Sequence, residues 1–201
     1  MTSLPPTPSH TVGPFYGYAL PFPGGGEPAP PCHPDTVTVH GYVYDGAGEP
    51  VPDALLELWQ AGPEGEIPGA PGSLRRDPAT GRHPGRDGVE FTGFGRVATG
   101  ADGHWAFRTL VPGARGGHAP YLSLCLFARG LLHHLFTRVY LPDLPGQGSA
   151  QAEAQTRDPL LASLDEERRG TLVAAAEPRT GTFRFDIRIQ GEKETVFLDF
   201  H

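Results

Sequence analysis

The sequence is poor in cysteine and in basic residues, and it has no long apolar segment. Its two cysteines, Cys32 and Cys125, lack the CxxC spacing of zinc and redox sites, so we expect two free thiols. Sixteen Lys and Arg against 23 Asp and Glu give a net charge of -7, which argues against binding to nucleic acid or to anionic membranes. No apolar run reaches spanning length, and the first ten residues do not resemble a signal peptide, so we expect a cytoplasmic protein.

Glycine and proline, in contrast, are abundant, with 28 and 23 residues. Such a composition favours short strands joined by turns over a helical bundle, and the length suits one domain. We therefore predict a mainly β chain, an antiparallel β-sandwich that forms a single domain over residues 1–201. Within it we expect an N-terminal arm (1–36), a long loop (62–90), and a loop with one or two short helices (143–170).

Alternating apolar residues predict most of the strands. The expected pairs of consecutive strands are 36–45 with 55–61, 91–99 with 104–110, and 121–127 with 131–141, each pair joined as a hairpin by a glycine-containing turn. A further strand is expected over 183–190. Asp158 before Pro159 and Asp165 before two glutamates are typical of helix N-termini, and Gly170 is typical of a helix end.

The segment 118–141 is the longest nearly charge-free stretch of the chain. In its first strand the leucines share one face, while Tyr121, Ser123 and Cys125 share the other. A polar pair such as Tyr121 and Ser123 beside a leucine core indicates either a functional site or the remains of one.

Motif spacing gives no metal site or serine nucleophile on its own. There is no HExxH or GxSxG sequence, and the adjacent His133 and His134 point to opposite faces of a strand. The loop histidines are read individually as solvated side chains: His10, His33, His83 and His118.

Several strand and turn segments nevertheless match the pattern of a known family. They are GYVYDGAGEPVPDA (41–54), ELWQA (57–61), FGR (94–96), GHWAFRT (103–109) and PG (112–113). Their order and spacing resemble the intradiol ring-cleaving dioxygenases, over roughly residues 7–200. Three more segments, TPSHTVGPF (7–15), LFARG (126–130) and FDIRIQGEKETVFLDF (185–200), are similar to the α subunits of the family members that cleave protocatechuate.

This resemblance implies a β-sandwich whose active members hold Fe(III) with two tyrosines and two histidines. The histidine positions here are Tyr121 and Ser123, the tyrosine positions fall near His83 and near Ala114 or Arg115, and His118 stands in place of a charge-stabilising arginine. Because these residues are a poor ligand set for a hard ferric ion, we expect no metal in this chain.

The resemblance also implies a partner. The Fe(III) would be bound by a β subunit, and the expected reaction is cleavage of protocatechuate with O2 to 3-carboxy-cis,cis-muconate at a site carried mainly by that subunit. This chain would contribute six substrate-binding residues to the rim of the site: Thr11, Val12, Gly13, Pro14, Phe15 and Arg129. At the position of Phe15 the family has tyrosine.

Two alternatives remain open from the sequence. One is a self-sufficient dioxygenase with an unusual ligand set of Tyr121, His83 and His118. The other is a non-catalytic ligand-binding sandwich, since this architecture also supports recognition without chemistry.

Overall fold

The structure is a computed structural model that describes residues 10–68, 77–81, 85, 89–143 and 149–200. The strands are β1 (Thr36–Tyr44), β2 (Leu55–Gln60), β3 (Phe94–Ala98), β4 (His104–Leu110), β5 (Leu122–Phe127), β6 (Leu135–Val139), β7 (Ala175–Ala176), β8 (Thr182–Arg184) and β9 (Ile187–Arg188). The helices are α1 (Tyr16–Ala19), α2 (Ala150–Thr156), α3 (Pro159–Ala162) and α4 (Glu166–Gly170).

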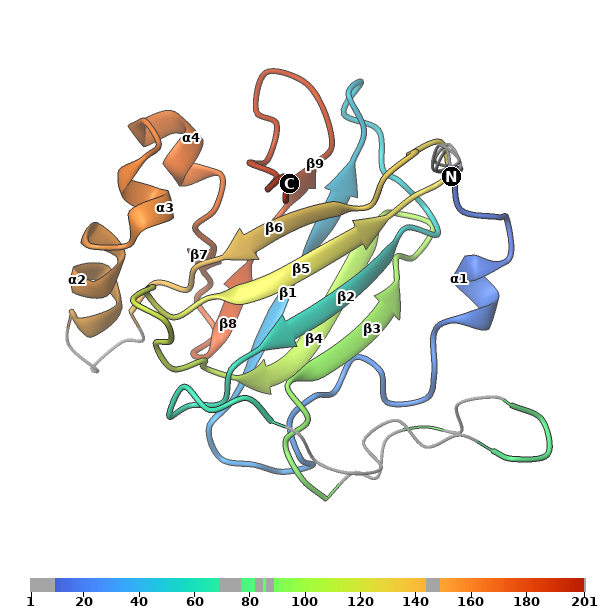
Figure 1. The fold of residues 1–201 in the computed structure, drawn as a ribbon, viewed down its shortest axis with the longest axis horizontal. Coiled ribbons are helices and arrows are strands. Elements are labelled where there is room, and N and C mark those ends of the chain that lie inside the picture. Colours follow the sequence, from blue (N-terminus) through green and yellow to red (C-terminus); the bar gives the residue numbers. More distant parts are fainter. Residues whose placement is uncertain (1–9, 69–76, 82–84, 86–88, 144–148, 201) are drawn as a thin grey trace, which may run out of the picture.

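The strands form two sheets packed face to face, which confirms the predicted sandwich (Figure 1). The four-stranded sheet has the order β3-β2-β5-β6, and the five-stranded sheet has the order β4-β1-β8-β7, with β9 also paired to β1. The core between the sheets takes Val37, Val39 and Val43 from one side and the β5 leucines from the other. The period-2 pattern of these strands therefore locates the core as expected.

Two of the three predicted hairpins are wrong. β1 pairs with β4 in one sheet, while β2 pairs with β3 in the other, so neither β1–β2 nor β3–β4 is a hairpin. Their connecting turns carry the chain from one sheet to the other. A glycine-containing turn reverses the chain in either arrangement, and only packing decides whether the second strand pairs with the first or faces it across the core. The third hairpin, β5–β6, is confirmed by antiparallel pairing from Leu122–Val139 to Leu126–Leu135.

The predicted strand 183–190 is divided into β8 and β9, both parallel to β1. The break coincides with Gly41, where a Cβ atom would collide with the Phe185 carbonyl oxygen. This close approach requires glycine at that position.

The two predicted helix starts are confirmed, since the Asp158 side chain accepts bonds from backbone N–H groups of α3, and that of Asp165 accepts one from Arg168 in α4. The sequence did not indicate α1 or α2. Helices α2, α3 and α4 lie at one end of the four-stranded sheet, and α1 lies at the opposite end, near the β5–β6 turn (Figure 1).

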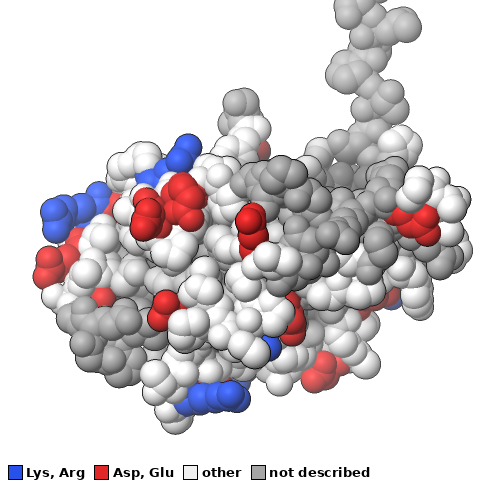
Figure 2. Space-filling view, turned by 90° about the horizontal axis from the view of Figure 1, so that it is seen from below, with Lys and Arg blue, Asp and Glu red and all other residues white. Residues whose placement is uncertain are grey.

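No helix in the described parts of the chain is long and apolar enough to cross a membrane. On the face shown in Figure 2, acidic side chains are scattered and basic ones occur in small separate groups. Among the residues described, this face offers no continuous basic surface for nucleic acid.

Candidate functional site

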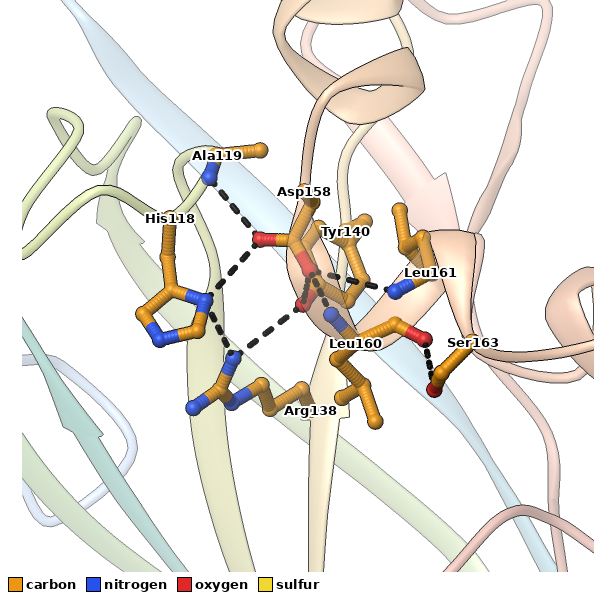
Figure 3. Close-up of polar contacts among 8 residues, drawn as sticks. All are labelled: His118, Ala119, Arg138, Tyr140, Asp158, Leu160, Leu161 and Ser163. Carbon is orange, nitrogen blue, oxygen red and sulfur yellow. Dashed lines mark hydrogen bonds and ion pairs between the residues drawn. The ribbon is translucent and has the colours of Figure 1, made fainter.

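A buried carboxylate organises the end of the sandwich where β5 begins (Figure 3). Asp158 has no exposed surface. Its Oδ1 accepts from the Leu160 N–H at 2.9 Å, the Leu161 N–H at 3.2 Å and the Tyr140 hydroxyl at 3.1 Å. Its Oδ2 accepts from the Ala119 N–H at 2.9 Å and lies 3.3 Å from His118 Nδ1. One side chain thus joins α3, the residue that follows β6 and the segment before β5.

The environment of Asp158 favours its charged form. Burial opposes ionisation, but bonds from the Leu161 and Ala119 amides, the Tyr140 hydroxyl and the Leu160 amide outweigh it and lower the pKa of Asp158. Burial also raises the pKa of Tyr140 to about 12, so this phenol stays protonated and donates to the carboxylate. The group is therefore a stable anion held by fixed donors.

Arg138 supplies the opposite charge beside this carboxylate. Its Nη1 is 3.2 Å from His118 Nδ1 and 3.3 Å from the Tyr140 hydroxyl (Figure 3). Because His118 Nδ1 also faces Asp158, the imidazole tautomer decides which of the two contacts is a hydrogen bond. The guanidinium carbon lies 4.0 Å from the centre of the Tyr121 ring, a cation–π distance.

This arrangement does not fit a ferric ion. Arg138 stands opposite Ser123 in the β5–β6 register and covers the ring of Tyr121, so a fixed positive charge lies on the sheet face shared by the two positions that resemble metal-ligand positions. His118 is engaged by Asp158, so it is not the solvated residue we expected. In the described part of the chain, no cluster of three or more His, Cys, Asp or Glu residues is arranged to hold a metal.

The remaining positions of the expected ligand set give no further support. His83 lies outside the described residues. Arg115 donates to the Gly65 carbonyl at 3.2 Å, which ties its loop to the segment after β2. The alternative of a self-sufficient dioxygenase built on Tyr121, His83 and His118 therefore has no geometric support among the described residues.

The N-terminal arm and the β5–β6 turn form a second cluster, at the other end of β5. The Gly130 N–H donates to Thr11 Oγ1 at 3.1 Å, so the structure brings the arm and this turn together. Val12 lines a hollow of about 90 Å³ between the arm and the turn, together with His10, Phe127, Ala128, Leu131, Leu132, His133 and His134. Gly13, Pro14 and Phe15 are exposed, and the Phe15 side chain is 73% exposed. The arm is thus docked at its start and presents its next residues outward.

Arg129 lies at the tip of this second cluster. Its Nη2 is 3.0 Å from Asp53 Oδ2, and its side chain remains 60% exposed. Asp53 also lies 3.5 Å from the hydroxyl of Tyr16, which is a buried residue of α1. The sequence did not single out Asp53 or Tyr16, because nothing local marks a contact between residues 37 positions apart.

The two clusters are separate places on the molecule. β5 has six residues, so its first and last residues are roughly 17 Å apart at about 3.3 Å per residue. The Asp158 cluster is largely internal, whereas the arm and Arg129 form an exposed surface. The second cluster therefore offers the more exposed side chains for contact with another molecule.

Comparison with known proteins agrees with the resemblance seen in the sequence. A family model described as Dioxygenase matches residues 30–121. The protocatechuate 3,4-dioxygenase alpha chain of Burkholderia cepacia is 39% identical over 218 residues, which cover 99% of this chain and all of that protein. The beta chain from the same organism is 29% identical over 177 residues, which cover 80% of this chain and 67% of that protein.

A solved structure shows the same fold. The dioxygenase domain of a carbohydrate-binding fusion protein from Streptomyces sp. SirexAA-E is 24% identical, with a TM-score of 0.53 over 93% of this chain and 99% of that one. The full-length sequence similarity is the stronger finding, because it extends over the arm, the β5–β6 turn and the C-terminal segment alike. The chain belongs to the dioxygenase family, in the branch of the protocatechuate 3,4-dioxygenase alpha chains.

Proposed function

We propose that this chain is the α subunit of a protocatechuate 3,4-dioxygenase and acts together with a β subunit. The complex would cleave protocatechuate between its two hydroxyl-bearing carbons with O2 to give 3-carboxy-cis,cis-muconate. The observation that carries this proposal is the 39% identity to an alpha chain over the whole length of both proteins. The proposal includes the cytoplasmic location expected from the sequence.

The pairing with a β subunit is supported by the similarity to both chains. The related organism has proteins named as alpha and beta chains of one enzyme, and this chain is more similar to the alpha chain. An alpha-type chain is therefore one half of a hetero-oligomer under this proposal.

We assign the Fe(III) of the complex to the β subunit. Iron would supply the activation of the ring diol and oxygen there. In this chain, the guanidinium of Arg138 over Tyr121 places a positive charge where the resemblance places metal ligands. A cation at this place opposes the binding of a second, more highly charged one.

The arm and Arg129 are the proposed contribution of this chain to the shared site. Gly13 and Pro14 are exposed and compact, so another chain can approach their backbone closely. The Phe15 ring adds an apolar wall but no hydroxyl. One nitrogen of the half-exposed Arg129 guanidinium is directed at Asp53, and a guanidinium, with its several N–H groups, suits the planar carboxylate of protocatechuate.

Reconstitution tests this function. The chain is prepared alone and together with its β-type partner, and iron content and oxygen consumption with protocatechuate are measured. We expect iron and activity only where the partner is present. A lone chain that binds Fe(III) with a tyrosinate colour and consumes oxygen with protocatechuate would show that the proposal is wrong.

The contribution of the exposed surface is tested in the same complex. We expect Arg129→Ala to raise KM for protocatechuate about ten-fold, as for loss of one hydrogen bond to a charged group. The matched control is Arg157→Ala, because Arg157 is an exposed arginine directly after α2, and α2 lies at the opposite end of the sheet. Equal effects of the two substitutions would argue against a role of Arg129 in the site.

A further inference from the structure

We propose that Asp53 and Tyr16 are positioning residues that hold Arg129 and the arm in place for the substrate carboxylate. This inference rests on the proposed function, because it needs a shared site next to Arg129. It concerns residues that lie behind the exposed surface and do not themselves reach the substrate.

Asp53 is the centre of this arrangement. One carboxylate oxygen is 3.0 Å from the Arg129 guanidinium, and the other is 3.5 Å from the Tyr16 hydroxyl. Asp53 joins the β1–β2 connection, the β5–β6 turn and α1, which are distant in sequence. Its backbone has a φ of 55°, in the left-handed region, where aspartate and asparagine are the tolerated residues other than glycine.

Tyr16 supports the same contact from inside. Its side chain is buried, and burial together with the charge of Asp53 raises its pKa, so the hydroxyl keeps its proton and can donate to the carboxylate. The backbone N–H of Arg129 partly offsets this rise in the pKa of Tyr16, so it lies near the same hydroxyl. Tyr16 therefore packs against both the β5–β6 turn and the carboxylate that holds the Arg129 side chain.

The arm is held by the same turn at both ends. Thr11 accepts from the Gly130 N–H, and Tyr16 meets Arg129 and Asp53. The four residues between Thr11 and Tyr16 therefore form a short loop closed on residues 129–130. Loosening Asp53 or Tyr16 frees the arginine side chain, whereas the bond between Gly130 and Thr11 continues to hold the start of the arm.

The contact between Asp53 and Arg129 directs the guanidinium without using all its donors. A guanidinium has five N–H groups, and a single nitrogen faces Asp53. The side chain is 60% exposed, so an unpaired arginine here would sample many rotamers. Holding it in one direction favours a ligand that carries a carboxylate, and it does nothing for a ring diol that lacks one.

The test compares two substrates in the reconstituted complex. Asp53→Asn keeps the shape and tolerates the left-handed backbone while removing the charge. We expect KM for protocatechuate to rise about five-fold with kcat nearly unchanged, as for loss of an exposed ion pair. For catechol, which lacks the carboxylate and is followed as substrate or competitive inhibitor, we expect no change. Asp35→Asn, another exposed aspartate, serves as the control.

Two further variants separate positioning from general structure. Tyr16→Phe is expected to produce a smaller KM increase, again for protocatechuate alone. In an Arg129→Met background, Asp53→Asn is expected to have no additional effect, since the pair acts as one unit.

The outcomes distinguish this inference from the function on which it rests. If the native complex does not cleave protocatechuate, both are overturned. If the native complex is active but Asp53→Asn changes neither substrate, or changes both equally, only the positioning role is wrong. Persistence of the Asp53→Asn effect in the Arg129→Met background would also refute it.

Discussion

Replacing Asp158 with alanine should destabilise the chain far more than the loss of an ordinary helix cap. The cap alone, through the two N–H groups of α3, is worth about 1 kcal/mol. The substitution also leaves the Ala119 N–H and the Tyr140 hydroxyl without an acceptor in a buried place, at about 1–3 kcal/mol each. We therefore expect the free energy of unfolding to fall by about 4 kcal/mol.

Thermal and urea unfolding followed by circular dichroism measure this loss. In a chain of this length, about 4 kcal/mol corresponds to a melting temperature lower by roughly 10 °C. Asp165→Ala is the matched control, because Asp165 caps α4 in the same way but is exposed and accepts a single backbone bond. We expect about 1 kcal/mol for this control.

The comparison between the two aspartates decides whether the argument is correct. If Asp158→Ala and Asp165→Ala cost the same, Asp158 is only a cap, and the bonds to β6 and to the segment before β5 add nothing. A double-mutant cycle with Tyr140→Phe gives the coupling directly, and we expect at least about 1 kcal/mol between the carboxylate and this hydroxyl.

Three other predictions follow from the structure. The pKa of Asp158 is lowered on folding, so its contribution to stability is complete above its pKa in the unfolded chain and is lost as the pH falls through its pKa in the folded chain. The urea midpoint should therefore change more between pH 6 and pH 3 for the native chain than for Asp158→Asn. Equal changes in the two proteins would contradict this prediction. Burial and the nearby carboxylate of Glu57 raise the pKa of Cys125 to about 12, whereas Cys32 is exposed. A thiol reagent at pH 8 should therefore modify one cysteine in the native chain and two in denaturant. Rapid modification of both cysteines in the native chain would refute the burial argument. Gly41→Ala should lower stability by about 2 kcal/mol or more through a backbone collision, while Gly170→Ala, with open space around it, should not, as thermal unfolding will show.

Most strands were predictable because they have a strong local signal, but two of the three predicted pairings were wrong. Alternation in 36–44 located a buried face that the structure confirms at Val37, Val39 and Val43. The turns gave no comparable information on pairing, since a reversal at residues 100–103 serves a hairpin and a crossing between sheets equally well. Hairpin β5–β6 was predicted correctly because both of its segments are rich in large apolar residues, although the connection between the strands is longer than the predicted turn and takes in residues 128–134.

The candidate site was predictable in part, for the same physical reason. Asp158 was recognised as a cap from its neighbours in sequence, but its bonds to Ala119 and Tyr140 span 39 and 18 positions and leave no local pattern. Asp53 likewise gave no signal in the sequence as the partner of Arg129. Local sequence patterns predict helix caps and the buried faces of strands. They do not predict contacts between residues that are far apart in the sequence, because those contacts form only when the chain folds.

The two anchors of the arm have an energetic consequence for the proposed shared site. Ordering a free backbone costs about 1–2 kcal/mol per residue, so fixing the residues between Thr11 and Tyr16 only on association would cost several kcal/mol. The bond from Gly130 to Thr11 and the contacts of Tyr16 order this segment within the chain itself, before any partner is present. The backbone entropy of this segment is therefore already lost when this subunit folds. Association with the partner then forms the contacts of Phe15 and Arg129 with a smaller further loss of conformational entropy.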